Sequence, residues 1–531
     1  MVWLDEELTR RQVVRGGVGG LALTGSAGLL AACGGSGTPN ATQGQDAKVN
    51  LRRGGTLRVG ATGGGAEDTV DGHKPTSDPD IMRTWQLYEP LAVRNPEFTE
   101  LEMVLAESLE AEAGKADAWT VRLKPGIEFH NGKAVTADDV IFSLRRILDP
   151  KDPKVGSASI GYVDAKGLKK LDKRTVRIPL QFANSTFPED IGQYFNGIVP
   201  VDFDPKNPVG TGPFKFKSIS PGEQSTFVRN PNYWVDNEPL VDELVIIDFT
   251  DATAKVNALL GGQVDAINNV PFSQLASIQG NPKLHAVISQ TGSWQPFTMR
   301  VDSPPFDDVR VRQAFRLIVD RNQMVQQVLS GQGRVANDMY APFDPCYAKD
   351  LPQRQQDLEQ AKSLLAQAGK SGLRVELVTG DIFRGVIEAA QVFAEQAKGA
   401  GVQVKVRKVD TGTFYGDNYL KWPFAQDFWS TRTYLTQVAQ GSLPSSPFNE
   451  THWDNPEFIK LIRQARGELD EDKRCELLHQ AQKLEYDQGG HIIPYFSNAI
   501  DAHSASIGGI VPARSGFTLG NYRLKQVGFK A

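Results

Sequence analysis

A strand, a helix and a second strand follow one another directly between residues 373 and 409. Residues 373–380 (LRVELVTG) and 402–409 (VQVKVRKV) alternate as strands do, and residues 386–399 (VIEAAQVFAEQAKG) have the periodicity of a helix. A crossover of this kind is right-handed, and it places its two strands parallel in one sheet. Because helices must then pack on that sheet, the unit predicts an α/β fold.

The first half of the chain also contains predicted strands and a helix in alternation. The predicted elements are a strand in GGTLRVGA at 54–61, a hairpin within 209–234, a strand ELVIIDF at 243–249, a helix at 250–262 and a short strand QVDAI at 263–267. The chain has 531 residues, more than one hydrophobic core normally serves. Two α/β lobes are therefore expected.

Two helix starts can be read from capping residues. Thr136 and Asp139 form a capping-box pattern ahead of an apolar stripe. Asp308 is predicted to cap one helix whose apolar face runs from Val311 to Val328. Before Thr136, the residues 119–135 predict a strand, a Pro-Gly break, a second strand and an Asn-Gly turn.

Composition and motifs narrow the functional classes. The chain has 58 Lys and Arg against 63 Asp and Glu, so its net charge is -5, and no basic stripe suits a nucleic acid. The catalytic motifs GxSxG, HExxH and GxxxxGK[ST] are not found in the sequence, so no enzyme is expected. The rival hypotheses are a secreted hydrolase and a surface receptor or chaperone that shares the fold without transport.

The first 53 residues predict an export signal followed by a flexible tether. Arg10 and Arg11 precede a Gly/Ala/Leu stretch at 16–32, which is too short for a membrane-spanning helix and indicates an export signal. The paired arginines resemble a twin-arginine signal. LAAC, ending at Cys33, looks like a lipobox whose thiol is acylated. The small and polar residues 34–53 predict a flexible tether, so a folded body would lie beside a membrane.

The other two cysteines leave several interpretations open. Cys346 and Cys475 can form one disulfide, remain buried thiols, or be unrelated, and their separation does not choose among these. Cys475 and His479 are four residues apart on a predicted helix and so share a face, but two ligands make a weak metal site. No metal and no cofactor are expected.

Several segments together resemble one family. They are GGTLRVG at 54–60, the run from Trp119 to Pro150, VGTGPFKF through RNPNYW at 209–234, GGQVDA at 261–266, SPPFDDVRVRQAFRLIVDR at 303–321 and DQGGHIIPYFSN at 487–498. These resemble the extracytoplasmic oligopeptide- and dipeptide-binding proteins of ABC importers, solute-binding family 5. The resemblance covers residues 54 to about 500.

The resemblance implies a two-lobed clamshell with mixed sheets flanked by helices. Lobe I would comprise residues 54–80, 208–300 and 491–531, a domain inserted in it would comprise 81–207, and lobe II would comprise 301–490. A monomer would hold a small peptide-like or anionic solute between the lobes and present it to a membrane permease and its ATPase subunits. Closure would then be a two-state hinge motion.

The resemblance also points to ligand-binding residues. Peptide-binding members carry a Trp-x-x-Asp element whose aspartate receives the α-ammonium of the peptide, and here that element reads Trp429 to Arg432. A guanidinium would repel an ammonium, so Arg432 is predicted to bind a ligand carboxylate between Trp429 and Tyr434. The alternative is that Arg432 pairs internally with Asp427 or another acid. A shift of the alignment onto Asp427 would partly restore the acidic role.

Three further aromatic residues complete the predicted set. Trp294 and Phe297 follow the strand near the hinge, and Tyr340 is a candidate in lobe II, although large aromatic side chains also serve as core. Tyr495 is expected to pack at the hinge instead.

Overall fold

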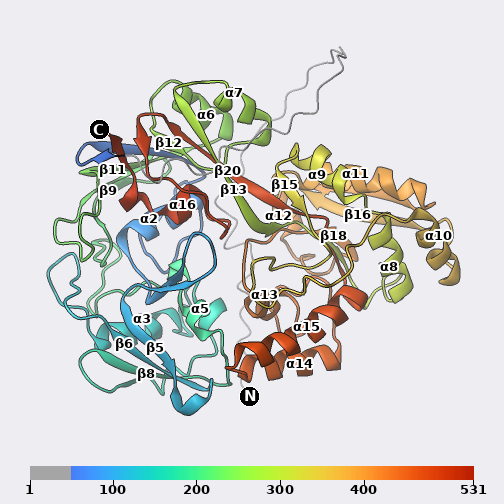
Figure 1. Ribbon diagram of the computed structural model, residues 1–531, viewed down its shortest axis with the longest axis horizontal. Coiled ribbons are helices and arrows are strands. Elements are labelled where there is room, and N and C mark those ends of the chain that lie inside the picture. Colours follow the sequence, from blue (N-terminus) through green and yellow to red (C-terminus); the bar gives the residue numbers. More distant parts are fainter. Residues whose placement is uncertain (1–49) are drawn as a thin grey trace.

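The computed structural model describes residues 50–531, which form two lobes and an inserted domain (Figure 1). The predicted export signal, with Arg10 and Arg11, the acylation site Cys33 and most of the tether lie outside the described residues. At its end the tether prediction differs from the structure, because β1 (Leu51–Arg52) pairs with the C-terminal strand β22 (Gly528–Lys530). The two-lobed α/β architecture predicted from the sequence is confirmed.

Lobe I is built on one mixed sheet with the order β13-β20-β12-β2-β11-β10-β9. Its strands are β2 (Thr56–Thr62), β9 (Phe214–Ser220), β10 (Gln224–Arg229), β11 (Glu243–Phe249), β12 (Ala266–Ile267), β13 (Leu284–Trp294) and β20 (Tyr495–Ser504). The strands β12, β2 and β11 run parallel, so their carboxyl ends share one edge. The helices α2 (Asp78–Leu87), α6 (Ala252–Leu260) and α7 (Leu275–Gln279) cover this sheet.

The inserted domain lies beside lobe I, at the lower left of Figure 1. It holds the pair β3 (Ala92–Arg94) and β4 (Leu101–Met103) and a sheet of β5 (Ala106–Ala111), β6 (Ala118–Leu123), β8 (Thr175–Pro179) and β7 (Lys169–Lys170). Helices α3 (Ala137–Ile147), α4 (Ser157–Ile160) and α5 (Phe187–Ile191) pack with it. Its apolar residues form a separate core, so it is a packed unit rather than a long loop.

Lobe II has a five-stranded sheet with the order β17-β16-β18-β14-β19. Its strands are β14 (Phe297–Met299), β16 (Arg374–Gly380), β17 (Gln403–Val409), β18 (Phe424–Gln426) and β19 (His491–Ile492). Its longer helices are α8 (Val309–Ile318), α9 (Arg321–Leu329), α10 (Leu358–Gln367), α11 (Val386–Gly399), α13 (Tyr434–Gly441), α14 (Pro456–Gly467) and α15 (Glu471–Gln488). Strands β16 and β17 are parallel and joined through α11, as predicted.

The chain crosses between the lobes twice, and each crossing contains a proline. β13 of lobe I continues through Pro296 into β14 of lobe II, and β19 of lobe II continues through Pro494 into β20 of lobe I. Phe297 pairs with Ile492, so the two crossings lie side by side. The short strand β15 (Gly333–Val335) of the second half also pairs with β20. The sheets therefore group 297–299 and 491–492 with lobe II, whereas the predicted lobe I runs to 300 and resumes at 491. The helix α2 packs in the core of lobe I, whereas the predicted inserted domain begins at 81.

Two element predictions from the sequence are wrong. The single helix expected after Asp308 is two helices, because Val319 is extended and Asp320 caps α9 through the backbone N–H of Gln323. The second strand expected after Pro125 is reduced to one bridge between Glu128 and Ala134. The capping box of Thr136 and Asp139 is confirmed.

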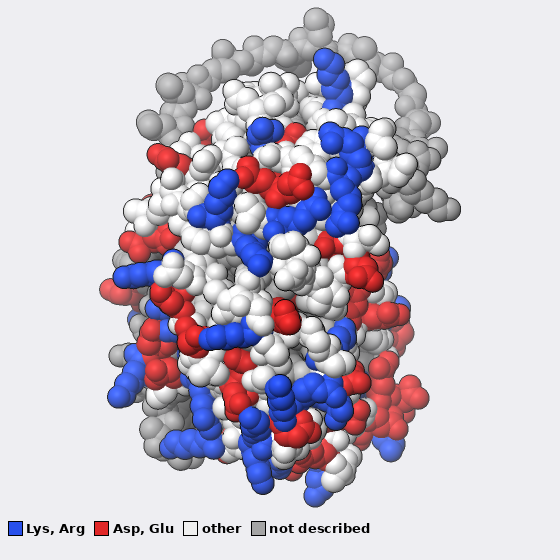
Figure 2. All heavy atoms as spheres, turned by 90° about the vertical axis from the view of Figure 1, so that its left-hand side faces the viewer, with Lys and Arg blue, Asp and Glu red and all other residues white. Residues whose placement is uncertain are grey.

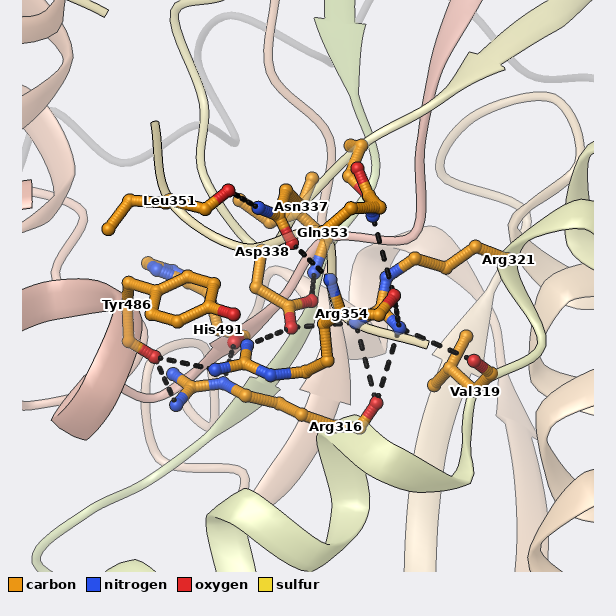
Figure 3. A network of polar contacts seen from close by, with 12 residues as sticks. Arg316, Val319, Arg321, Asn337, Asp338, Leu351, Gln353, Arg354, Tyr486 and His491 are labelled. Carbon is orange, nitrogen blue, oxygen red and sulfur yellow. Dashed lines mark hydrogen bonds and ion pairs between the residues drawn. The ribbon is translucent and has the colours of Figure 1, made fainter. Parts of the chain in front are cut away.

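A network of buried arginines supports the second crossing from lobe II (Figure 3). Asp338 accepts hydrogen bonds from Arg321 at 2.6 Å, from Arg354, and from the backbone N–H of Ile493 at 2.9 Å. Burial alone would raise the pKa of Asp338, but Arg321, Arg354 and Arg316 lower it on balance. Ile493 directly precedes Pro494, so this ionised carboxylate holds the start of the crossing.

Cys346 and Cys475 form a disulfide that ties a loop of lobe II to α15. Cys475 is therefore not available as a thiolate for the weak metal pair with His479, and among residues 50–531 no group of three potential ligands that could hold a metal ion occurs.

None of the helices within 50–531 is long and apolar enough to cross a membrane. Figure 2 shows positive and negative side chains interspersed over the side of lobe I and the inserted domain.

Candidate ligand site between the lobes

The segment that carries Arg432 runs between β18 and α13 and is fixed at both lobes. Trp429 and Trp294 exchange two backbone hydrogen bonds, at 2.9 and 3.0 Å. Thr431 donates through Oγ1 to the carbonyl of Arg514 at 2.6 Å and accepts from the backbone N–H of Gly292 at 2.8 Å. The backbone around Arg432 is thus held between a crossing strand and the C-terminal part of lobe I.

Arg432 lines a cavity to which all three parts of the molecule contribute. The lining side chains that matter here are Trp85 and Phe517 of lobe I, Arg94, Glu189 and Tyr194 of the inserted domain, and Arg432 of lobe II. The cavity volume is about 60 Å³. Small-molecule pockets usually measure roughly 300–1,000 Å³, so a larger solute requires the lobes to part before it enters.

The cavity is rich in hydrogen-bond donors. Arg94 donates to Glu189 at 2.6 Å through one terminal nitrogen, while its buried Nε has no hydrogen-bond partner among residues 50–531. The buried Nε1 of Trp85 has none either. Arg432 lies with its guanidinium 5.3 Å from the ring centroid of Trp429. Unsatisfied buried donors are costly, so Nε of Arg94 and Nε1 of Trp85 favour a ligand that supplies acceptor oxygens.

The titratable groups around the cavity also favour an acceptor. Burial raises the pKa of Glu189, and the nearby Arg94 opposes that effect. Burial likewise raises the pKa of Tyr194, which keeps its phenol neutral and able to donate. With Arg94, Arg432 and Glu189 as the charged residues of the lining, cations outnumber carboxylates. The local field therefore attracts an anionic group.

Four of the predicted ligand residues form one column of stacked rings inside lobe II. Trp429 stacks on Trp294 at 6.0 Å, Trp294 on Tyr340 at 5.1 Å, and Tyr340 on Tyr434 at 5.2 Å, with interplanar angles of 16–18°. Each of the four is at most 3% exposed. These rings support the segment of Arg432 from behind, and none of them is among the residues that line the cavity.

The column ends at a buried acid. Glu485 accepts hydrogen bonds from the hydroxyl groups of Tyr340 and Tyr434, at 2.9 and 2.8 Å, and from Ser442 at 3.1 Å. Burial raises the pKa of Glu485, and these donors together with His491 oppose that effect. The two tyrosines are therefore anchored at their polar ends, as buried phenols require.

The remaining predicted residues lie in the interior. Phe297 packs in the core of lobe II against Phe393, at 4.7 Å between ring centroids. Tyr495 is fully buried at the second crossing and donates to Gln295 at 2.9 Å, which matches its expected place at the hinge. Asp427 is 1% exposed and accepts from the phenols of Tyr415 and Tyr419. Its carboxylate is thus engaged within lobe II.

The sequence did not single out Trp85, Arg94, Glu189, Tyr194 or Phe517. These residues are far apart in the chain, and no local motif distinguishes them from ordinary surface or core positions. Only the docking of the inserted domain against both lobes brings them together. Of the residues that line this cavity, Arg432 is one that the resemblance pointed to.

Comparisons with known proteins agree with this architecture. Residues 100–448 match the family model described as bacterial extracellular solute-binding proteins, family 5 Middle. Heme-binding protein A of Haemophilus influenzae is 28% identical over 473 residues, covering 81% of this chain and 85% of that protein. Oligopeptide-binding protein AppA of Bacillus subtilis is 28% identical over 504 residues, covering 88% of this chain and 91% of that protein.

A solved structure shares the fold. The periplasmic binding protein AgaA of A. tumefaciens R10, in complex with agropinic acid, superposes with a TM-score of 0.75. It is 22% identical in sequence, and the match covers 90% of this chain and 99% of that one. Because the family model spans well over half of the chain, the chain belongs to the bacterial extracellular solute-binding proteins, family 5.

Proposed function

We propose that this chain is a lipid-anchored substrate-binding protein of an ABC importer. It captures a small peptide-like or carboxylate-bearing solute between its lobes and delivers it to a membrane permease that a separate ATPase drives. The observation that carries the proposal is the cavity that joins Arg432 of lobe II to groups of lobe I and the inserted domain. A ligand that touches both lobes favours the closed form, which is what such a receptor needs.

The chemistry of the cavity supports a ligand with an anionic group. Arg432 and Arg94 offer guanidinium groups, which bind carboxylates in a bidentate manner, and Trp85 adds an indole donor. The ring of Trp429 lies against Arg432 and restricts its orientation. A free α-ammonium placed beside Arg432 would be repelled, so the ligand presents its carboxylate end to this residue.

The ligands named for similar proteins vary. The relatives above are named for haem and for oligopeptides, and the structural neighbour holds agropinic acid. Agropinic acid carries an acid group by name, as the cavity chemistry here favours. We therefore place modified peptides and opine-like conjugates among the first compounds to examine.

A thermal-shift screen of peptides, opines, sugars and metal chelates tests the proposal. A solute that binds the folded protein raises its melting temperature by mass action. For each hit, calorimetry on Arg432→Ala should show an affinity at least about tenfold lower, because a charge-assisted hydrogen bond contributes about 1.5–3 kcal/mol. Arg407→Ala, an exposed arginine of the same lobe that lies over Trp422, is the matched control. Equal affinity in wild type and Arg432→Ala would remove Arg432 from the binding site.

The anchor has its own test. Labelling of cells with a radioactive fatty acid should mark the wild type and not Cys33→Ser. Replacement of Arg10 and Arg11 by lysine should retain an unprocessed precursor if export follows the twin-arginine route. Equal labelling of both forms contradicts the anchor, and normal processing of the lysine variant contradicts that route.

A further inference from the structure

A loop of lobe II reaches across to lobe I through Arg384. The loop follows β16 and leads into α11, at the carboxyl end of the lobe II sheet. Arg384 donates through Nη1 to the side-chain oxygen of Asn269 at 3.1 Å and through Nη2 to the carbonyl of Asn498 at 3.4 Å. Asn269 lies two residues after β12 and Asn498 lies in β20, so both acceptors belong to lobe I. These bonds join the two lobes directly.

Aromatic rings from both lobes enclose the guanidinium of Arg384. It lies 5.3 Å from the ring centroid of Phe272 in lobe I and 5.4 Å from that of Phe383 in lobe II. Phe272 packs against the core of each lobe. A half-buried cation held between rings in this way is stabilised by their quadrupoles. One aromatic ring from each lobe therefore contacts the same guanidinium group.

The backbone that carries Arg384 is fixed at the hinge. Gln295, between β13 and Pro296, donates to the carbonyl of Arg384 at 3.0 Å, and Tyr495 of the second crossing holds Gln295 at 2.9 Å. Gly385 follows with φ +83, a conformation that favours glycine. These contacts restrict the direction in which the side chain of Arg384 extends toward lobe I.

Two acidic side chains of lobe I lie near Arg384. Asp78 accepts from Asn268 and Asn269 at 3.1 and 2.9 Å, and Asp501 accepts the backbone N–H of Leu519 at 2.6 Å. Lys255 of lobe I and Arg384 of lobe II act on both acids. Contact between the lobes therefore brings a second cation to this pair of acids, which favours their ionised forms.

The titration of this cluster agrees with its burial. Burial raises the pKa of Asp501 to about 7 and lowers the pKa of Lys255 to about 8. The pKa of Arg384 is lowered by burial, which Asp501 and Asp78 partly offset. The charges of the two lobes are therefore coupled in a setting where water screens them little.

We propose that Arg384 is a positioning residue that latches the two lobes together through contacts between protein groups alone. The proposal rests on the proposed function, in which closure around a solute is the working motion. It predicts that part of the closing free energy is built into the protein, so a solute needs to supply correspondingly less differential affinity. Loss of the latch should shift the equilibrium toward the open form.

The test measures the distance between the lobes without any solute. Nitroxide labels on Leu171→Cys of the inserted domain and Lys460→Cys of lobe II, both exposed, are placed in full-length protein that also carries Cys33→Ser. Pulsed electron resonance should show one dominant short distance. With Arg384→Ala the distribution should gain a population at longer distances, and the radius of gyration from X-ray scattering should rise.

Two further variants sharpen the result. Arg407→Ala removes an arginine of the same lobe that also lies over a ring and an acid, but within lobe II, and should leave the distances unchanged. Asn269→Gly removes the side-chain acceptor of Arg384 on lobe I, at a residue whose φ of 45 suits glycine, and leaves the carbonyl of Asn498 in place. It should shift the distances in the same direction as Arg384→Ala but less far, and the double variant should add little to Arg384→Ala. It also replaces Arg384→Ala if that variant does not fold.

Unchanged distances in both Arg384→Ala and Asn269→Gly would overturn the latch. This result is independent of the solute screen, since no solute is present. If the lobes open but no solute is ever found, the latch stands and the proposed ligand chemistry fails. If solutes bind but neither variant alters the distances, the proposed function stands and the latch fails.

Discussion

Trp294 of the first crossing and Trp429 of lobe II exchange two backbone hydrogen bonds and stack with their ring centroids 6.0 Å apart. This pair links the hinge to the segment that presents Arg432 to the cavity. We expect a change at Trp294 to alter the position of Arg432, because Trp429 lies three residues before Arg432 in the same segment. The stacked aromatic residues would then influence the cavity indirectly, through the position of this segment.

Truncation of the column should destabilise the protein. Trp294 is 1% exposed and stacks on two rings, so Trp294→Ala should lower the free energy of unfolding by about 3–5 kcal/mol through lost burial and the cavity left behind. Urea denaturation followed by circular dichroism measures this. Phe182→Ala, at a ring that is 46% exposed, is the control and should cost less than about 1 kcal/mol. Similar losses in both variants would contradict a structural role for the column.

His130 should contribute a loss of stability as the pH drops from about 6.5 to about 4. Its Nδ1 accepts the backbone N–H of Gly210 at 3.2 Å, and its Nε2 lies 3.0 Å from the carbonyl of Gly212, so the neutral ring satisfies both partners. Burial lowers the pKa of His130 from 6.5 to about 4. Between these values the unfolded chain binds a proton that the folded protein does not, so acid favours unfolding.

A single variant isolates this contribution. The full effect of one histidine is a slope of about 1.4 kcal/mol per pH unit between the two pKa values. His130→Asn lacks it, so its free energy of unfolding should depend less steeply on pH than that of the wild type from pH 6.5 down to about 4. Above pH 7.5 the two slopes should agree. Parallel curves over the whole range would show that His130 does not titrate as described.

Removal of the carboxylate in Figure 3 should weaken lobe II and the second crossing. Asp338→Asn leaves Arg321 and Arg354 buried without their acid, which should cost about 3–5 kcal/mol. Asp302→Asn breaks an ion pair with Arg300 at a carboxylate that is 43% exposed, so it should cost at most about 1 kcal/mol. Chemical denaturation compares the two. Equal costs would mean that burial does not set the strength of the Asp338 network.

The disulfide should contribute to the stability of lobe II. Its two cysteines are 129 residues apart, so the bond restricts a long loop in the unfolded chain, and its loss should lower the free energy of unfolding by about 2–5 kcal/mol. The double variant Cys346→Ala and Cys475→Ala can be compared with oxidised wild type by thermal unfolding. Mass spectrometry after alkylation under denaturing conditions counts free thiols. Two alkylated thiols at Cys346 and Cys475 without reductant would show that the bond is absent.

Local patterns were sufficient for much of the fold. The parallel unit around α11 and the capping box at Thr136 depend on residues close in sequence, and both are confirmed. The break at Val319 was missed because the apolar stripe continues in phase across it, from Ile318 to Val325. The periodicity of apolar residues shows which face of a helix is buried. It does not show that α8 ends at Ile318 and that Asp320 caps a new helix.

The cavity itself could not be derived from any local pattern. Arg94, Tyr194, Arg432 and Phe517 are spread over more than 400 residues, and their meeting depends on how three cores dock. The resemblance points to Trp294 and Phe297 as pocket residues, yet both lie in apolar cores. Residue type alone does not separate a pocket wall from an interior position.

The prolines at the two crossings determine which backbone hydrogen bonds a rotation between the lobes would have to break. Pro296 and Pro494 have no N–H, so both hydrogen-bond ladders are already interrupted at the level where lobe I meets lobe II. We expect rotation at this level to leave the strand pairs on either side intact. The balance between the open and closed forms would then depend on the side chains that meet between the lobes and on the hydrogen bonds of Gln295 beside the hinge.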